Sequence, residues 1–448
     1  MSIKTFASLV SAAACAAAFC NYGGRIALDR KDGIYRSGDT AVCSVTLTKD
    51  GKPLKGVKAR MILKWERNII ETKDFETTGK PVKFTCKGEK PGWAYFGFEV
   101  LGDDGKPLRG KGVFKHRMKP TIVTEIGAMF DPDKIVSPVR EPADFDEFWA
   151  KRVAEVNAAP LEPELTELKS GVKGIRLFAV KLPVVRGIMA SGYLAYPENA
   201  KPGSLPAQIF FQSLTNSDVS RAAAINPAKN GALAFAATWH GFPVGKEAKY
   251  YEKVIPPYSR GATKNIGDRE KWVNSDMFFR VLRELQFIKS RPEWDGRNLV
   301  SNGGSLGGIQ SACATAMDPQ VSLAVISVPG GCECNAYEAG RVPYGVFRRL
   351  GVEKLKADPK YIEMGFYYDA VNFAKRIKCP VYVCTGFADE TCFPSNVYAF
   401  YNAIPATTPK TMTTNPRTGH FGTTKNVGGD EQVKKLFRAV IISELPKN

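Results

Sequence analysis

The stretch NLVSNGGSLGGIQSACATAMD, residues 298–318, decides how the rest of this chain is interpreted. Residues 303–307 within it read Gly-Gly-Ser-Leu-Gly and so match the pattern Gly-x-Ser-x-Gly. In this pattern a strand turns sharply into a helix, and glycines flank the serine because larger side chains would clash there. The run NLVSN predicts a buried strand before the turn, and IQSACATAM predicts a helix after it. The stretch therefore predicts that Ser305 is an exposed nucleophile between a strand and a helix.

A serine is a poor nucleophile at neutral pH and needs an adjacent base. The chain has three histidines: His116, His240 and His420. In the α/β-hydrolase fold, where this serine pattern recurs, the order along the chain is nucleophile, acid, histidine. His116 and His240 precede Ser305, so His420, in the glycine-flanked loop NPRTGHFGTT, is the predicted base.

The acid that orients the imidazole must then lie between Ser305 and His420, at the end of a strand. The strand-like run CPVYVCTG is followed by Phe-Ala-Asp-Glu, which makes Asp389 the predicted acid and Glu390 its close competitor. Other carboxylates in the interval lie near helix ends, where we expect them to act as caps: Asp318, Asp358 and Asp369.

The spacing of apolar residues changes along the chain. After a proline-rich joint, FDPDKIVSPVREPADFDEFW, strand-like and helix-like segments alternate, which predicts a mostly parallel sheet covered on both faces. Before it, short runs of strand formers separated by turn dipeptides predict a sandwich of two sheets. A chain of 448 residues also exceeds what one core usually organises. We therefore expect an α/β-hydrolase domain over residues 127–448, preceded by a smaller all-β immunoglobulin-like sandwich domain over residues 19–126.

The elements expected in the larger domain follow from the same patterns. Strands are predicted at RLFAVKLP, ASGYLAYP, AQIFFQS, ALAFAAT, NLVSN, LAVISV, PVYVCTG and KTMTTN. Helices are predicted from FDEFW to Asn157 and at 274–291, 305–317, 367–376, 395–403 and 430–443. In the smaller domain, Trp65, Trp93 and Tyr95 are more typical of packing than of stacking on sugars.

Residues 1–18 are typical of a signal peptide. Lys4 precedes an apolar alanine-rich run, and residues 16–18 offer small side chains for cleavage. A lipid anchor at Cys20 is disfavoured because the large Phe19 precedes it. No later apolar stretch is long enough to span a bilayer. We therefore expect a secreted or periplasmic protein without a stable membrane span.

Export makes the cysteines candidates for disulfides. Cys43 and Cys86 are the two in the N-terminal third after the signal region and are the predicted pair. For Cys332 and Cys334 a disulfide is the first interpretation, with a place on the pocket rim as the alternative. The chain lacks Cys-x-x-Cys pairs and histidines at ligand spacing, so we expect no metal, and the chemistry requires no cofactor.

The formal net charge is +18. The basic residues do not gather into a run or a helix face and match no nucleic-acid motif, so we expect no nucleic-acid partner. Two interpretations of the charge remain open: a preference for anionic polysaccharides, or an ordinary solvated surface.

The chain resembles the acetyl xylan esterase and cephalosporin-C deacetylase family, carbohydrate esterase family seven. The resemblance covers roughly residues 130–448 and is carried by PADFDEFW, by MFFRVLRELQFIKSRPEWDGRNLVSNGGSLGG and by YYDAVNFAKRIKCPVYVCTGFADETCFPSNVYAFYNAI. It implies that Asp389 is the acid and that the later Gly-His supplies His420. The preceding sandwich is similar to that of extended, exported relatives.

One turn departs from the family pattern. The resemblance implies a His-Gly-Tyr-like turn that helps to form the oxyanion hole, but this chain has Gln212-Ser213-Leu214 there, and Leu306 stands where relatives often have glutamine. Backbone donors survive side-chain changes, so the expected donors are the N–H groups of Leu214 and Leu306. Trp239-His240-Gly241 ends a predicted strand near the site, and we expect a structural role for it, with substrate contact as the alternative.

The resemblance and the predicted triad together imply a secreted serine carboxylesterase that removes acetyl groups from xylan-like carbohydrate through an acyl-enzyme. The expected partner is an acetylated oligosaccharide or polysaccharide. Two alternatives stay open: an esterase for another acyl or antibiotic ester, and a non-catalytic polysaccharide-binding protein. Relatives often form ring-like oligomers, but the extra N-terminal domain leaves the oligomeric state open.

Overall fold

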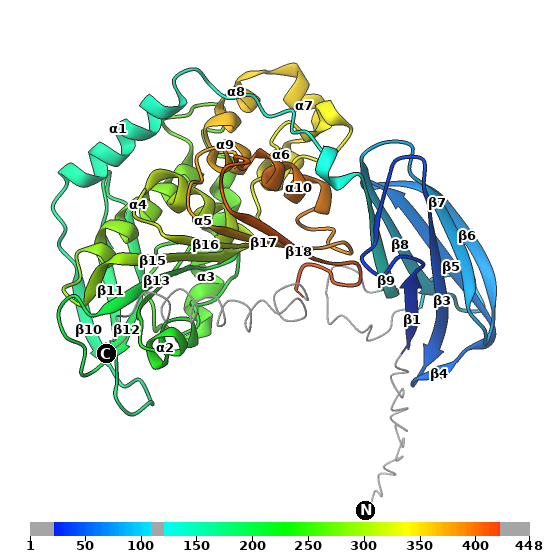
Figure 1. The fold of residues 1–448 in the computed structure, drawn as a ribbon, viewed down its shortest axis with the longest axis horizontal. Helices are drawn as coiled ribbons and strands as arrows, with labels where there is room; N and C mark the ends of the chain where they lie inside the picture. The colour runs from blue at the N-terminus through cyan, green and yellow to red at the C-terminus, as the bar shows by residue number, and fades with distance from the viewer. Residues whose placement is uncertain (1–21, 109–120, 422–448) are drawn as a thin grey trace, which may run out of the picture.

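The structure is a computed structural model that describes residues 22–108 and 121–421. It has an all-β part, formed by the first nine strands, beside a larger part in which helices cover a central sheet (Figure 1). The predicted signal peptide, His116 and the predicted helix 430–443 lie outside the described residues.

The all-β part consists of two sheets that enclose a common apolar core. Its strands alternate buried residues with half-buried or exposed ones where one face meets solvent, as over residues 40–49 and 82–87. One sheet has the order β2 (Ile34–Tyr35), β9 (Ile122–Phe130), β8 (Gly92–Val100), β5 (Lys55–Trp65) and β6 (Asn68–Thr78). The other contains β1 (Tyr22–Leu28), β3 (Thr40–Lys49) and β4 (Lys52–Pro53), with β7 (Val82–Lys87) paired to β3.

The predicted all-β sandwich is thus confirmed, and the domain boundary predicted between residues 126 and 127 falls inside β9.

Strand β8 is buried along its whole length, which is unusual for a sandwich strand. Phe96 and Phe98 point into the sandwich core, whereas Trp93 and Tyr95 join a second cluster with side chains of the larger part. Because successive side chains alternate between the two faces, one strand serves both cores. Trp93 and Tyr95 therefore pack, as predicted, and are not open to sugars.

The larger part is built on a nine-stranded sheet. Its order is β10 (Glu164–Leu168), β11 (Ile175–Pro183), β12 (Met189–Pro197), β14 (Leu233–Ala237), β13 (Leu205–Phe211), β15 (Trp294–Gly304), β16 (Leu323–Ser327), β17 (Val381–Gly386) and β18 (Lys410–Asn415). The strands from β14 to β18 run parallel, and those from β10 to β14 in this order pair antiparallel. All eight predicted strands are present, and β10 was not predicted.

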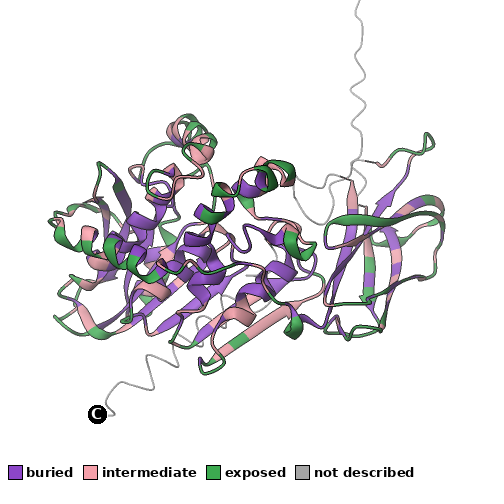
Figure 2. Ribbon diagram, turned by 90° about the horizontal axis from the view of Figure 1, so that it is seen from above, coloured by how far each residue is buried: buried purple, intermediate pink, exposed green. Residues whose placement is uncertain are grey.

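Helices lie on both faces of this sheet, and its central strands are buried (Figures 1 and 2). Helices α1, α4, α5 and α9 share the main core on one face, while α2 packs on the other. The helices are α1 (Phe145–Ala158), α2 (Ala222–Lys229), α3 (Ala248–Arg260), α4 (Asp276–Lys289), α5 (Leu306–Met317), α6 (Gly345–Leu350), α7 (Val352–Ala357), α8 (Lys360–Tyr367), α9 (Ala370–Ala374) and α10 (Pro394–Ala403). Short 3-10 turns are η1 (Pro132–Lys134), η2 (Gly261–Thr263), η3 (Val273–Ser275) and η4 (Ala336–Ala339).

The helix predicted over 367–376 is wrong in extent. Helix α8 already ends at Tyr367, and a new helix, α9, begins after Asp369. The Asp369 carboxylate accepts the N–H of Val371, so it caps α9 as expected. Asp318 and Asp358 likewise lie at helix ends.

The predicted Cys43–Cys86 disulfide is wrong: both thiols are free. In the antiparallel pair of β3 and β7, Cys43 lies opposite Phe84 and Cys86 lies opposite Ala41. The two cysteines are therefore diagonal neighbours, whose Cβ atoms are typically ~7 Å apart, whereas a disulfide needs about 4 Å.

The disulfide interpretation of Cys332 and Cys334 is also wrong. Both thiols are free and buried in the main core. Neither belongs to the rim of the cavity beside Ser305.

Candidate active site

Ser305 lies at the sharp turn between β15 and α5. Its backbone has φ 55° and ψ −120°, a strained conformation for a residue with a side chain. Flanking glycines permit the turn: a Cβ on Gly303 would lie 2.1 Å from the carbonyl oxygen of Gly307, and one on Gly307 would lie 2.2 Å from that of Phe211. The local sequence thus folds into the predicted nucleophile elbow.

The structure brings Ser305, His420 and Asp389 together although they are far apart in the sequence. His420 Nε2 lies 3.0 Å from Ser305 Oγ, and His420 Nδ1 lies 2.8 Å from Asp389 Oδ2. Asp389 follows β17 and His420 follows β18, so both residues come from loops at the carboxyl edge of the sheet. This is the geometry of a nucleophile, a base and an orienting acid.

Asp389 is fully buried, and its second carboxylate oxygen is also occupied. Asp389 Oδ1 accepts the backbone N–H groups of Thr391 at 2.7 Å and Cys392 at 3.0 Å. These bonds stabilise the charged carboxylate and fix its orientation. Glu390, the competing acid of the sequence analysis, instead forms an ion pair with Lys64.

The charge of Asp389 controls the protonation of His420. Burial on its own lowers the pKa of His420, but the negative charge of Asp389, the adjacent Cys392 side chain and the hydrogen bond to Asp389 raise this pKa above its ordinary value. The pair therefore favours an imidazolium, the form that a histidine takes when it accepts a proton from a serine nucleophile. The proximity of Cys392 to His420 was not predicted.

Leu214 and Leu306 both line the cavity next to Ser305. Within the described residues, neither backbone N–H has a backbone or side-chain acceptor, and Leu306 is the first residue of α5, where N–H groups have no partner inside the helix. Both groups are free to bind a developing oxyanion.

The turn at residues 212–214 has no glycine, unlike the turn that the family resemblance implies. None of its residues has a positive φ, so the backbone does not require one. Gln212 holds the turn from within by donating to Thr215 Oγ1 at 3.0 Å and to the carbonyl of Ser217 at 3.1 Å. Ser213 Oγ donates to the carbonyl of Gly304 at 2.7 Å, which ties the turn to the elbow.

A cavity of about 330 Å³ opens beside Ser305. Its walls are mostly apolar, with Trp239, Trp272 and Phe278 among them, and its charged lining residues are Arg348 and Arg349. His240 does not line this cavity. It is buried, its Nδ1 accepts the N–H of Phe242, and burial lowers its pKa to about 4, which agrees with a structural role for His240. Trp239 of the same run, in contrast, lines the cavity.

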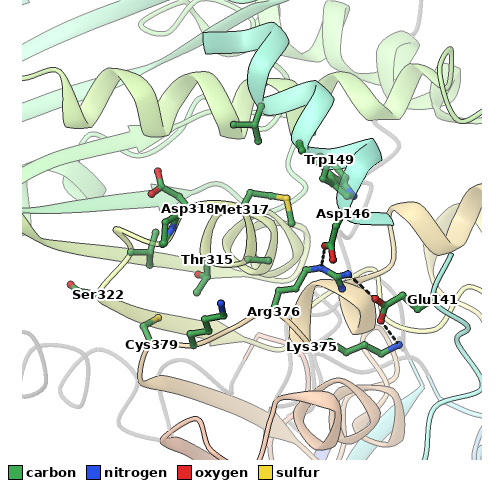
Figure 3. A pocket seen from close by; sticks show the side chains of 16 residues that line it. Glu141, Asp146, Trp149, Thr315, Met317, Asp318, Ser322, Lys375, Arg376 and Cys379 are labelled. Carbon is green, nitrogen blue, oxygen red and sulfur yellow. Dashed lines mark hydrogen bonds and ion pairs between the residues drawn. The ribbon is translucent and has the colours of Figure 1, made fainter. Parts of the chain in front are cut away.

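A larger hollow of about 970 Å³ lies elsewhere, between α1 and the end of α5 (Figure 3). Four of its charged lining residues pair with one another: Arg376 pairs with Glu141 and Asp146, and Lys375 also pairs with Glu141. It contains none of the predicted triad residues.

The all-β part touches the loop that carries Asp389. Trp93 Nε1 donates to the carbonyl of Phe387 at 2.7 Å, and a Cβ on Gly127 would lie only 1.8 Å from that oxygen. At the tip of the β5–β6 hairpin, the buried carboxylate of Glu66 accepts the hydroxyl of Ser395 at 2.6 Å. Sequence reasoning missed this contact, although the burial of both faces of β8 agrees with its mostly apolar sequence.

Groups of His, Cys, Asp or Glu that could hold a metal ion are absent from the described part of the chain. In the same part, no helix is both long and apolar enough to cross a membrane.

The fold is that of an α/β-hydrolase, and Ser305, His420 and Asp389 lie in the arrangement that serine hydrolases of this fold use. The sequence model of the family described as acetyl xylan esterase (AXE1) matches residues 134–436, two thirds of the chain. The chain therefore belongs to the acetyl xylan esterase family and is a carboxylic ester hydrolase.

Similar proteins agree with this assignment. The chain is 28% identical over 324 residues to the acetyl esterase Axe7A of Xylanibacter ruminicola, which covers 70% of each protein. Its fold matches the acetyl xylan esterase from Paenibacillus sp. R4 with a TM-score of 0.58 at 23% identity, over 68% of this chain and 97% of that one. It matches acetyl xylan esterase 1 from Thermoanaerobacterium sp. JW/SL YS485 with 0.57 at 22% identity, over 68% and 96%.

Proposed function

We propose that this protein is an exported serine esterase that removes acetyl groups from carbohydrate by way of a covalent acyl-enzyme. The observation that carries the proposal is the continuous chain of short contacts from Asp389 through His420 to Ser305, at the mouth of a cavity. In this arrangement Ser305 is the nucleophile, His420 the general base and Asp389 the orienting acid.

The first half of the reaction forms the acyl-enzyme. Ser305 Oγ attacks the ester carbonyl while His420 Nε2 takes the hydroxyl proton, and the N–H groups of Leu214 and Leu306 bind the resulting oxyanion. When the tetrahedral intermediate collapses, the bond to the sugar oxygen breaks and His420 returns the proton to that oxygen. The products of this half are acetyl-Ser305 and a free sugar hydroxyl.

The second half releases the acid. Water attacks acetyl-Ser305, His420 accepts a proton from it, and the same backbone N–H groups bind the second oxyanion. Collapse of this intermediate returns the proton to Ser305 Oγ and frees acetate. His420 thus serves as base and acid in turn, and every step uses groups of this chain and water.

The carbohydrate substrate is supported by the relatives, two of which are named acetyl xylan esterases. The export of the protein is supported by residues 1–18, whose pattern is that of a signal peptide. Cleavage after this segment on expression in a secreting host, detected as the N-terminal sequence of the mature protein, tests the export.

Acetate release from acetylated xylo-oligosaccharides tests the reaction and the nucleophile together. We expect the mature protein to release acetate and Ser305→Ala to lower kcat by at least about 10⁴-fold, because the array works as a unit. Release that persists in Ser305→Ala would refute the role of Ser305. The absence of release from these substrates and from small activated acetyl esters would refute the enzyme and favour a polysaccharide-binding protein.

A bulkier acyl group is the second candidate, favoured by the size of the cavity. Its 330 Å³ is in the range of pockets that bind whole small molecules, about 300–1,000 Å³, and far exceeds what an acetyl group fills. A series of p-nitrophenyl esters of increasing chain length distinguishes the two: a kcat/KM that falls beyond acetate supports acetyl, and one that rises supports the longer acyl group.

A further inference from the structure

The charged residues that line the Ser305 cavity are both arginines. Arg348 and Arg349, in the last turn of α6, line the cavity, and its described lining contains no aspartate or glutamate. A third guanidinium, that of Arg67, comes from the tip of the β5–β6 hairpin. The ring of Phe393 lies near the arginines of both the hairpin and α6: its centroid is 5.7 Å from Cζ of Arg67 and 6.0 Å from Cζ of Arg348.

These three arginines have no counter-charge in the described part of the chain. None of the ion pairs formed there includes Arg67, Arg348 or Arg349. The contrast with Arg376 in the larger hollow is plain, because Arg376 has two carboxylate partners there (Figure 3).

Arg348 is partly buried, so water does not fully hydrate its charge. Burial lowers the pKa of Arg348, and the positive charges of Arg67 and Arg349 lower it further, while the Cys392 side chain acts in the opposite direction. A cation in this position is destabilised by its surroundings, and an anion that enters the cavity would relieve the repulsion. The position of the arginines at the end of α6 is favourable to cations, but it does not account for the lack of an acid around them.

We propose that the sugar portion of the substrate is anionic, and that its carboxylate or sulfate oxygens accept hydrogen bonds from the guanidinium groups of Arg348 and Arg349, with Arg67 adding its field from the sandwich. This inference rests on the proposed function, since it names the leaving group of the same reaction. The anion belongs to the sugar because an acetyl group carries no charge. The volume left beside an acetyl group and the apolar walls suit the C–H face of a sugar ring.

The guanidinium fork matches both carboxylate and sulfate, so the probes must separate them. We would measure kcat/KM for acetate release from three substrates: acetylated xylo-oligosaccharides bearing a glucuronic acid branch, the same oligosaccharides after reduction of the carboxyl group to an alcohol, and acetylated oligosaccharides bearing a sulfate ester. The proteins are the wild type, the double variant Arg348→Gln/Arg349→Gln, and Arg297→Gln. Arg297 is an exposed arginine on β15 that does not line the cavity, so it controls for the loss of a positive charge.

We expect the wild type and Arg297→Gln to prefer an anionic substrate over the neutral one by roughly tenfold, the contribution of one charge-assisted hydrogen bond. The double variant should bring this ratio close to one, and sodium chloride should reduce it in the wild type. Preference for the uronic acid alone, the sulfate alone or both identifies the anion and supports the inference.

Equal hydrolysis of charged and neutral substrates by the wild type would overturn the inference and leave the proposed function intact. A preference that survives in the double variant would also overturn it. The absence of acetate release from every substrate would instead refute the proposed function, and the inference with it.

Discussion

Trp93→Phe tests whether the sandwich holds the catalytic loop in place. Trp93 is fully buried, and its indole N–H is the donor to the carbonyl of Phe387, two residues before Asp389. The N–H groups of this loop are bonded to the loop that carries His420, since Phe387 donates to Asn415 and Ala388 donates to Thr418. Loss of the indole donor therefore removes one of the contacts that the sandwich makes with this loop, and the ion pair of Lys64 with Glu390 remains.

The stability cost and the catalytic cost of this substitution can be separated. An unpaired buried carbonyl costs about 1–3 kcal/mol of unfolding free energy, and the smaller ring adds a cavity. Trp149→Phe is the matched control: Trp149 is 1% exposed and its indole donates to the carbonyl of Tyr367 at 2.9 Å, but it lines the hollow of Figure 3 and not the Ser305 cavity. We expect both variants to lose a similar amount of stability.

The two variants should differ in kcat. A displacement of the acid of about 1 Å lowers the rate by up to ~100-fold, so we expect Trp93→Phe to lose ten- to a hundredfold in kcat on p-nitrophenyl acetate, with KM little changed. Trp149→Phe should stay within about twofold of the wild type. Urea unfolding of the same samples gives the stability of each. If Trp93→Phe kept the kcat of Trp149→Phe at the same loss of stability, the positioning role of the Trp93 hydrogen bond would be refuted.

Two further substitutions test the charges of the site. Asp389→Asn should lower kcat by roughly 10⁴-fold because the imidazole loses its orienting partner. In the wild type the neutral imidazole is the base and its pKa is raised, so the rate should increase with pH through a pKa above the usual 6.5, and a wild-type profile that rises below this value would contradict the coupling. Burial raises the pKa of Glu66 from 4.5 to about 7, so the stability this group contributes below pH 4.5 is lost as pH rises to 7. The free energy of unfolding of Glu66→Gln, relative to that of the wild type, should therefore increase by up to roughly 3 kcal/mol between pH 4.5 and pH 8 in urea unfolding. The same difference between variant and wild type at both pH values would refute this.

The sequence predicted the catalytic sheet and its array because each feature has a local signal. Ser305 has flanking glycines, Asp389 follows a strand of apolar residues, and the fixed chain order left His420 as the base. The tolerance of the Gln212-Ser213-Leu214 turn for the loss of glycine had no such signal, because it depends on the φ angles of that turn and on hydrogen bonds to Thr215 and Ser217.

The failed and missing predictions share a physical cause. They depend on the register of paired strands and on contacts between residues that are far apart in the sequence. Cys43 and Cys86 are suitable in number and position, but a disulfide is decided by which residues face each other across two strands, and here the register places them diagonally. Arg348 and Arg349 are, in the sequence, two more cations in a basic chain. Two features of the structure distinguish them. The described lining of the cavity contains no carboxylate, and Arg67 of the sandwich lies near the same Phe393 ring as Arg348. From the net charge of the chain alone, both a preference for anionic polysaccharides and an ordinary solvated surface stayed open as interpretations. The excess of arginines over carboxylates in the lining of the Ser305 cavity is what favours the anionic sugar.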